Sequence, residues 1–148
     1  MKGPIHPNTN HYKRMFSIRT FENLILDSYK TGLLRGTTHT YIGQESIAVS
    51  ALSYLNKDDI IVSNHRCHGH FLAYCEAYEG LLHEIMGTSK GICEGVGGSQ
   101  HLQYDNFYSN GVLGGTVANA VGMALTEKKK KKGNIVVCFM GDGSLGEG

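Results

Sequence analysis

Two stretches of this sequence carry side chains that could bind phosphate or a metal ion. The first is "GDGSLG", residues 141–146, which follows an apolar run. It formally matches the dinucleotide-binding pattern GxGxxG, but Asp142 between the glycines would repel a bare pyrophosphate. A divalent cation reverses that repulsion, because Mg²⁺ is typically held by one or two carboxylates together with phosphate oxygens. Two interpretations stay open here: a metal–diphosphate site, or a surface turn in which Asp142 caps the next helix.

The second stretch is "SNHRCHGH", residues 63–70, which follows a β-branched run. Its three histidines and one cysteine could suggest zinc, but structural zinc ligands normally come as two close pairs separated by a longer loop. Only Cys93 and His101 could supply a second pair, and they lack that spacing. Arg66 favours phosphate, because a guanidinium repels a cation and binds phosphate through two parallel hydrogen bonds. We expect His70 to be a helix-surface or partly buried residue without a chemical role.

Periodicity predicts the elements that position these stretches. Apolar residues recur at spacings of three and four in the helical segments, and short β-branched runs indicate buried strands. Residues 87–115 are rich in glycine and have no period, and a loop of that length in a compact domain is usually functional. We predict helices over 15–34, 44–55, 70–78, 81–86 and 116–128, and strands over 60–62 and 135–140.

Strands separated by helices are typical of an α/β fold with a parallel sheet. Only two strands are evident, although parallel sheets are covered on both faces and are rarely so narrow. We therefore expect a domain cut short after the Gly-Asp-Gly turn. Our predicted division is an N-terminal helical segment in residues 1–35 and a partial α/β domain in residues 36–148.

Composition narrows the class of protein. The chain has 148 residues, of which 41% are hydrophobic and 18% charged, values typical of one globular domain. A net charge of +1 gives no reason to expect nucleic acid or an anionic membrane as a partner. The longest apolar run, residues 135–140, is far too short to span a membrane. Four cysteines without a CxxC pair indicate free thiols and a cytoplasmic protein.

Five blocks, taken in order, resemble the α subunit of thiamine-diphosphate-dependent 2-oxo acid dehydrogenases, the first component of the pyruvate and acetoin dehydrogenase type. They cover about residues 31–148 in family order and at family-like spacing. The resemblance implies the N-terminal part of such a subunit and a thiamine-diphosphate-binding fold that holds the diphosphate and Mg²⁺. The blocks are "GLLRGTTHTYIGQESIAVSAL", "SNHRCHGHFLA", "GGSQH", "SNGVLGGTVANAVGMAL" and "VVCFMGDGSLGEG".

The resemblance assigns the Gly-Asp-Gly turn to the diphosphate. Asp142 would be the Mg²⁺ ligand, and it would follow Gly141 at the start of the turn. Gly143 and Ser144 would present backbone N–H groups to phosphate at a helix N-terminus.

It also implies roles for residues in three other blocks. Arg66 matches an arginine that reaches the diphosphate, and His65 stands beside it where the family usually has tyrosine. Gly111 and Leu113 match a loop whose backbone meets the aminopyrimidine ring. His39 matches a histidine that lines the active-site entrance and would act near the reacting carbon.

The implied reaction is oxidative decarboxylation of pyruvate or a related 2-oxo acid, with the acyl group passed to the lipoyl group of a partner acyltransferase. The implied assembly is α2β2. The β subunit would supply the glutamate that activates the cofactor, so Glu45 and Glu94 receive no such role. We expect the 148-residue chain to be inactive alone. Two alternatives stay open: an acetoin dehydrogenase α subunit, or a non-catalytic scaffold that only binds a β-like partner.

Overall fold

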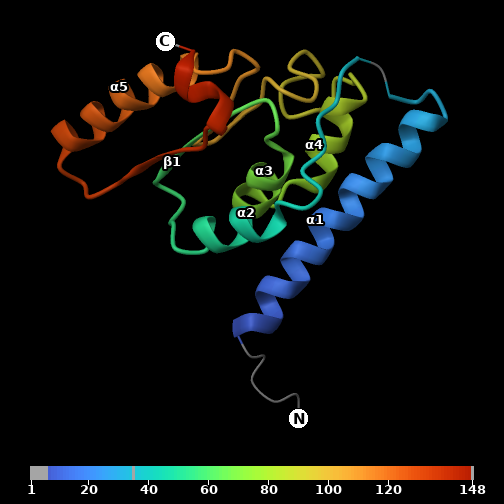
Figure 1. The fold of residues 1–148 in the computed structure, drawn as a ribbon, viewed down its shortest axis with the longest axis horizontal. Helices are drawn as coiled ribbons and strands as arrows, with labels where there is room; N and C mark the ends of the chain where they lie inside the picture. The colour runs from blue at the N-terminus through green and yellow to red at the C-terminus, as the bar shows by residue number, and fades with distance from the viewer. Residues whose placement is uncertain (1–6, 35, 148) are drawn as a thin grey trace.

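The computed structural model describes residues 7–34 and 36–147. Within these residues, helices and strands alternate around one small sheet (Figure 1). None of the described helices has both the length and the apolar character that a membrane crossing needs. The elements are α1 (Pro7–Lys30), α2 (Glu45–Leu52), β1 (Ile60–Ser63), α3 (His68–Cys75), α4 (Tyr78–Ile85), β2 (Gln103–Tyr104), β3 (Phe107–Ser109), α5 (Gly115–Lys130), β4 (Val136–Cys138) and the 3₁₀ helix η1 (Asp142–Gly146).

The sheet has the strand order β2-β3-β1-β4. Strand β1 pairs in parallel with β3 on one side and with β4 on the other, so the predicted α/β class with a parallel sheet is confirmed. The prediction of only two strands is wrong, because β2 and β3 form an antiparallel hairpin inside the glycine-rich segment. These strands of two and three residues are too short to show a period, and Asp105 turns the chain between them with φ at 48°.

The crossovers place helices on both faces of the sheet. The chain moves from β1 to β3 in one direction and then from β3 past β1 to β4 in the other. Because parallel crossovers are right-handed, the two connections lie on opposite faces. Helix α5 therefore lies apart from α2 and α3 in Figure 1 and packs on β4 and β1.

Helix α1 contributes to the same apolar core as the rest of the chain. The predicted stripe Ile18, Phe21 and Ile25 is buried and packs with residues of α2, α3 and β1. The helix is longer at its start than predicted and ends at Lys30, after which Gly32 takes a φ of 73°. The division into residues 1–35 and 36–148 stays a prediction.

The predicted boundary between helices 70–78 and 81–86 is misplaced. Gly80 lies inside α4, and the chain turns instead at Glu76, which has the left-handed φ of 55°. Gly80 serves packing: a Cβ atom there would lie 2.7 Å from Cγ2 of Ile92, so the glycine lets the following loop approach the helix.

The apolar side of helix α5 does not face the core. Thr116, Ala120 and Glu127 are buried, whereas Val121 and Leu125 are 65% and 53% exposed. The helix begins one residue before the predicted start, and its N-cap residue Gly114 supplies no side-chain hydrogen bond. An apolar helix face consequently lies open in this chain.

Candidate functional site

Three loops meet at one edge of the sheet. Parallel pairing aligns Val62 with Tyr108 on one neighbouring strand and with Cys138 on the other. The segments that leave β1, β3 and β4 therefore emerge at the same carboxyl edge, where ligands bind in open α/β sheets. These segments contain every site residue predicted from the sequence except His39.

A pocket of about 330 Å³ joins the loop after β1 to the loop after β4. His65 and Arg66 line it from the first loop, and Gly141 and Asp142 line it from the second. The two polar stretches singled out in the sequence, more than seventy residues apart, thus share one cavity. Its remaining walls come from Tyr41, Gln44, Ile47, Asn64, His70, Phe139 and Met140.

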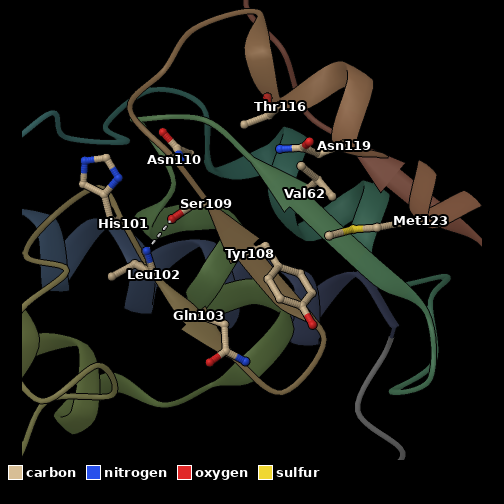
Figure 2. A pocket seen from close by; sticks show the side chains of 10 residues that line it. All are labelled: Val62, His101, Leu102, Gln103, Tyr108, Ser109, Asn110, Thr116, Asn119 and Met123. Carbon is tan, nitrogen blue, oxygen red and sulfur yellow. Dashed lines mark hydrogen bonds between the residues drawn. The ribbon is translucent and has the colours of Figure 1, made fainter. Parts of the chain in front are cut away.

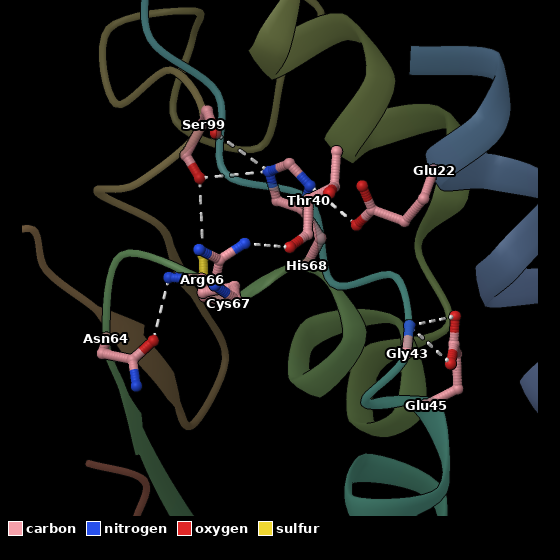
Figure 3. A network of polar contacts seen from close by, with 9 residues as sticks. All are labelled: Glu22, Thr40, Gly43, Glu45, Asn64, Arg66, Cys67, His68 and Ser99. Carbon is pink, nitrogen blue, oxygen red and sulfur yellow. Dashed lines mark hydrogen bonds and ion pairs between the residues drawn. The ribbon is translucent and has the colours of Figure 1, made fainter. Parts of the chain in front are cut away.

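Arg66 is held in place through its own loop and the segment before α2. Its backbone N–H donates to Oδ1 of Asn64 at 2.8 Å, and its guanidinium donates to the carbonyl of Thr40 (Figure 3). Arginine has five N–H donors in a planar fork. One of them is used by Thr40, which leaves a fixed guanidinium with donors for an anion in the pocket.

His65 and His39 form an edge-to-face pair. Their ring centroids lie 4.7 Å apart with the planes at 89°. Burial, assisted by the nearby His39 and Arg66, lowers the pKa of His65, so its ring is neutral at pH 7. Nδ1 of His65 is buried and has no hydrogen-bond partner among the described residues. The structure therefore places His39 beside the pocket, next to a histidine that has an unused polar atom.

Asp142 is exposed at the start of the short helix η1. Its Oδ1 accepts a hydrogen bond from the N–H of Gly143 at 2.9 Å, and the N–H of Ser144 donates to the carbonyl of Gly141 at 3.0 Å. The carboxylate is thus free to meet a cation from the solvent side. The two backbone donors expected to meet phosphate have internal acceptors here, so their role stays a prediction.

The loop after β3 lies against η1 rather than in the pocket of Arg66. A Cβ atom at Gly114 would lie 2.8 Å from Cβ of Glu147, which shows how closely the two segments approach. Leu113 is 43% exposed, and Gly111 packs beside Gln100 and His101. The structure therefore brings Gly111 and Leu113 to the same sheet edge, outside the set of residues that line the pocket of Arg66.

A second pocket of about 260 Å³ lies on the other flank of β1, beneath the start of α5 (Figure 2). Asn110, Thr116 and Asn119 supply polar groups from one side, and Val62 and Tyr108 form the sheet side. This pocket adjoins the loop that carries Gly111 and Leu113. The carboxyl edge thus has a cavity on each side of β1.

The side chains of the histidine-rich stretch diverge. Cys67 and His68 contact Ser99, whereas His70 contacts Tyr41 and Ser63. Among the described residues, no group of three or more His, Cys, Asp or Glu side chains is arranged to hold a metal ion. The geometry therefore offers no support for a zinc site. A cation at Asp142 would need further ligands other than the His, Cys, Asp and Glu side chains of the described residues.

The expectation that His70 is a surface or partly buried residue is wrong. The side chain is 4% exposed and lines the pocket of Arg66. Burial lowers the pKa of His70 to about 3, because the charged form of the ring loses its hydration inside the protein. Sequence periodicity could not reveal this, since α3 is nearly buried throughout and has no polar face to orient it.

The glycine-rich segment is organised around one buried carboxylate that the sequence did not reveal. Oε2 of Glu84 accepts hydrogen bonds from the N–H groups of Cys93 and Gly95, at 2.7 and 2.9 Å. Oε1 accepts those of Gly97 and Gly98, at 2.7 and 3.0 Å. The segment is therefore an ordered loop, and its glycines allow the backbone to close around the carboxylate.

A second buried network ties this loop to α1 (Figure 3). His68 Nδ1 lies 3.0 Å from Oε1 of Glu22, and His68 Nε2 lies 3.0 Å from Oγ and 3.2 Å from the carbonyl oxygen of Ser99. The spacing is that of a hydrolase triad. Nε2 is shared, however, between the hydroxyl and the backbone carbonyl of Ser99, and Ser99 lies in the buried interior rather than in the pocket of Arg66. The network is therefore structural.

The pocket of Arg66 has the properties that a magnesium diphosphate requires. It offers a fixed guanidinium, a buried histidine nitrogen without a partner and a single exposed carboxylate. One carboxylate is a typical protein contribution to Mg²⁺ when phosphate oxygens and water complete the shell. The residues present therefore fit that group.

Comparison with known proteins agrees with the geometry. A sequence profile described as "Dehydrogenase E1 component" matches residues 12–148. The α subunit of acetoin:2,6-dichlorophenolindophenol oxidoreductase from Bacillus subtilis is 40% identical over 140 residues, which are 93% of this chain and 42% of that protein. The pyruvate dehydrogenase E1 component subunit alpha from Zymomonas mobilis is 36% identical over 141 residues, which are 93% of this chain and 40% of that protein.

Proposed function

Because this chain belongs to the dehydrogenase E1 component family, we propose that it forms the magnesium- and diphosphate-binding part of the α subunit of a thiamine-diphosphate-dependent 2-oxo acid dehydrogenase. The chain spans about two fifths of the length of these two relatives. The observation that carries the proposal is the single pocket lined by Arg66 and Asp142 at the carboxyl edge of the sheet.

The roles within that pocket follow from charge and exposure. Asp142 would hold Mg²⁺ from the solvent side, and Arg66 would bind the diphosphate through the donors that Thr40 leaves free. His65, neutral at pH 7, donates or accepts one hydrogen bond at the phosphate. His39 packs edge-to-face against His65 and would orient groups near the reacting carbon. Bound thiamine diphosphate supplies the electron sink for decarboxylation, and the protein supplies position and charge.

Substrate and partners come from the relatives. Their names include pyruvate dehydrogenase and acetoin oxidoreductase α subunits, so pyruvate and acetoin are the two candidate substrates. We propose a β subunit as the partner and a lipoyl-bearing acyltransferase as the acceptor of the acyl group. The exposed apolar face of α5, with Val121 and Leu125, is a suitable subunit contact. The relatives include bacterial and mitochondrial proteins, so a cytoplasmic location stays a prediction.

Isothermal titration of the chain with thiamine diphosphate and Mg²⁺ tests the proposal. We expect binding that is lost with EDTA, because Asp142 would hold the Mg²⁺ that accompanies the diphosphate. Free thiamine with Mg²⁺ should not bind, because it lacks the diphosphate. Asp142→Ala should raise the Kd by at least about tenfold, which corresponds to the loss of one charge-assisted contact of about 1.4 kcal/mol.

Asp58→Ala is the matched control. Asp58 is also exposed but lies in the turn before β1, outside the residues that line the pocket. Its Kd should stay within about twofold of that of the unmodified chain. Undiminished binding by Asp142→Ala, or equal binding of thiamine and thiamine diphosphate, would refute the proposal.

A further inference from the structure

His70 contacts three segments that are distant in the sequence. Its Nε2 lies 2.8 Å from Oη of Tyr41, and its Nδ1 lies 2.9 Å from Oγ of Ser63. Its ring stacks on that of Phe139, with centroids 3.7 Å apart and planes at 20°. One buried imidazole therefore connects the segment before α2, the end of β1 and the end of β4.

Each of these partners is a close neighbour in the chain of a residue in the proposed site. Tyr41 follows Thr40, whose carbonyl accepts a hydrogen bond from Arg66. Ser63 is the last residue of β1 and leads into His65 and Arg66. Phe139 donates its N–H to the carbonyl of Val62 at 2.8 Å and leads into Gly141 and Asp142. His70 thus contacts the bases of both the loop that carries Arg66 and the loop that carries Asp142, beside the backbone pairing that joins β1 to β4.

The fold leaves room for this contact through one glycine. Gly69 lies between His68 and His70 on α3, and a Cβ atom there would lie 2.0 Å from Cδ1 of Tyr41. The Tyr41 ring could not move aside to relieve this clash, because Tyr41 is only 1% exposed. The absence of a side chain at Gly69 therefore allows the Tyr41 ring to reach His70.

The surroundings of His70 favour a neutral ring, because the side chain is buried and both of its hydrogen-bond partners are hydroxyl groups. Tyr41 and Ser63 are hydroxyl residues, and neither supplies a negative charge for an imidazolium. Burial, and then the Glu45 carboxylate, raises the pKa of the Tyr41 phenol, so Oη keeps its proton. In the simplest arrangement Oη–H donates to Nε2 and Nδ1–H donates to Oγ of Ser63. Both ring nitrogens are then occupied, which leaves none for a ligand.

We propose that His70 is a positioning residue of the magnesium-diphosphate pocket: it acts through Tyr41, Ser63 and Phe139 to hold the Arg66 and Asp142 loops at the spacing that a bound diphosphate needs. This inference rests on the proposed function for its ligand. It assigns His70 no contact with the ligand itself. Small displacements of binding groups have large effects, so the loss of this connection weakens binding without removing any binding group.

Three substitutions separate the contacts of His70. His70→Phe keeps a ring for Phe139 but loses both hydrogen bonds. His70→Asn places an amide near the position of Nδ1 and can keep the bond to Ser63, and His70→Gln can instead keep the bond to Tyr41. The matched control is His83→Phe on α4, because Nδ1 of His83 also bonds a hydroxyl, that of Thr88 at 3.0 Å, away from the pocket.

The first measurement is the Kd for inorganic pyrophosphate with Mg²⁺, by isothermal titration at pH 7.5. We expect His70→Phe to weaken binding by about tenfold or more, the amide variants to lie between it and the unmodified chain, and His83→Phe to stay within about twofold. The second measurement is amide hydrogen exchange without ligand. His70→Phe should speed exchange in residues 40–43 and 139–144, and His83→Phe should not.

The two measurements separate this inference from the proposed function. If the unmodified chain binds neither pyrophosphate nor thiamine diphosphate, the proposed function fails, and exchange alone decides whether His70 holds the two loops. If His70→Phe matches the unmodified chain in both measurements, the inference is overturned. A lower unfolding midpoint in His70→Phe with unchanged Kd and unchanged exchange also overturns it, because the residue would then serve stability alone.

Discussion

His68 and His70 lie two residues apart on α3 and are both buried, yet their surroundings are of opposite kinds. His68 faces the carboxylate of Glu22 and the backbone of the glycine-rich loop. His70 faces two hydroxyls and an aromatic ring, and no carboxylate within residues 7–34 and 36–147 bonds to it. The first contact joins α1 to the body of the fold, whereas the second joins the loops of the proposed site. One short helix thus supports stability on one side and the pocket on the other.

The two histidines offset the cost of burying a polar side chain in different ways. A buried carboxylate needs a hydrogen-bonding partner, so Glu22 depends on His68. Oε2 of Glu22 has no partner among the described residues, which makes that dependence stronger. His70 stays uncharged at neutral pH, and its two hydroxyl neighbours can satisfy both nitrogens of the neutral ring. A change at His68 should therefore affect unfolding most, and a change at His70 should affect the pocket and its pH response.

The largest effect is expected for His68→Phe. It leaves the fully buried carboxylate of Glu22 without its partner, and breaking such a pair from one side costs about 3–5 kcal/mol. Urea unfolding at pH 7.5, monitored by circular dichroism, measures the loss. The same change at the half-buried His83 should cost less than about 1.5 kcal/mol.

A double substitution sharpens this test. When both partners of a buried pair are replaced by apolar residues, the cost is often small. Glu22→Leu combined with His68→Phe should therefore recover most of the stability that His68→Phe alone loses. A loss below about 1 kcal/mol for His68→Phe, or no recovery in the double variant, would contradict the dependence of Glu22 on His68.

A smaller effect concerns pH and is specific to His70. In the folded chain its pKa is about 3, whereas an unfolded histidine titrates near pH 6.5. The unfolded state therefore binds the extra proton first, so stability is fully present above about pH 6.5 and is lost as the pH falls toward 3. Between pH 7 and pH 5 the unmodified chain should lose about 2 kcal/mol more than His70→Phe. Parallel unfolding curves for the two proteins over this range would exclude a neutral, buried His70.

Much of the proposed site follows from local sequence. The strand that ends in Ser63 and the strand before Asp142 are short, β-branched and followed by polar residues, and parallel pairing brings their ends to one edge. That reasoning places Arg66 and Asp142 each at the end of a strand, and the structure adds that the two strands are neighbours. Helix stripes such as that of Ile18 are also local, because a 3.6-residue period identifies the buried face.

The rest depends on contacts between distant residues. Glu22 and His68 are 46 residues apart, and no spacing rule connects them. The four N–H groups that surround Glu84 belong to a segment without a period, so its order is invisible in the sequence. The apolar stripe of α5 is visible, but which side meets the sheet depends on the crossover. Val121 is consequently exposed where periodicity alone favours burial.

The smallest predicted losses of stability come from replacing Ser63, which bonds His70, or Ser99, which bonds His68. Ser63→Ala removes the acceptor of Nδ1 of His70, and no other atom replaces it among the described residues. Ser99→Ala removes only the hydroxyl, since Nε2 of His68 still has the carbonyl of Ser99 at 3.2 Å. A buried donor left without a partner costs about 1–2 kcal/mol, whereas loss of one of two acceptors costs about 0.5 kcal/mol.

Urea unfolding of both variants at pH 7.5 measures this order directly. A larger loss in Ser63→Ala means that His70 depends on a single acceptor at Nδ1, and that its ring is held only if Ser63 stays in place at the end of β1. Equal losses would mean that the ring of His70 turns to a different partner. The spacing of the Arg66 and Asp142 loops would then tolerate such a shift, because Tyr41 and the stacking on Phe139 would suffice to hold them.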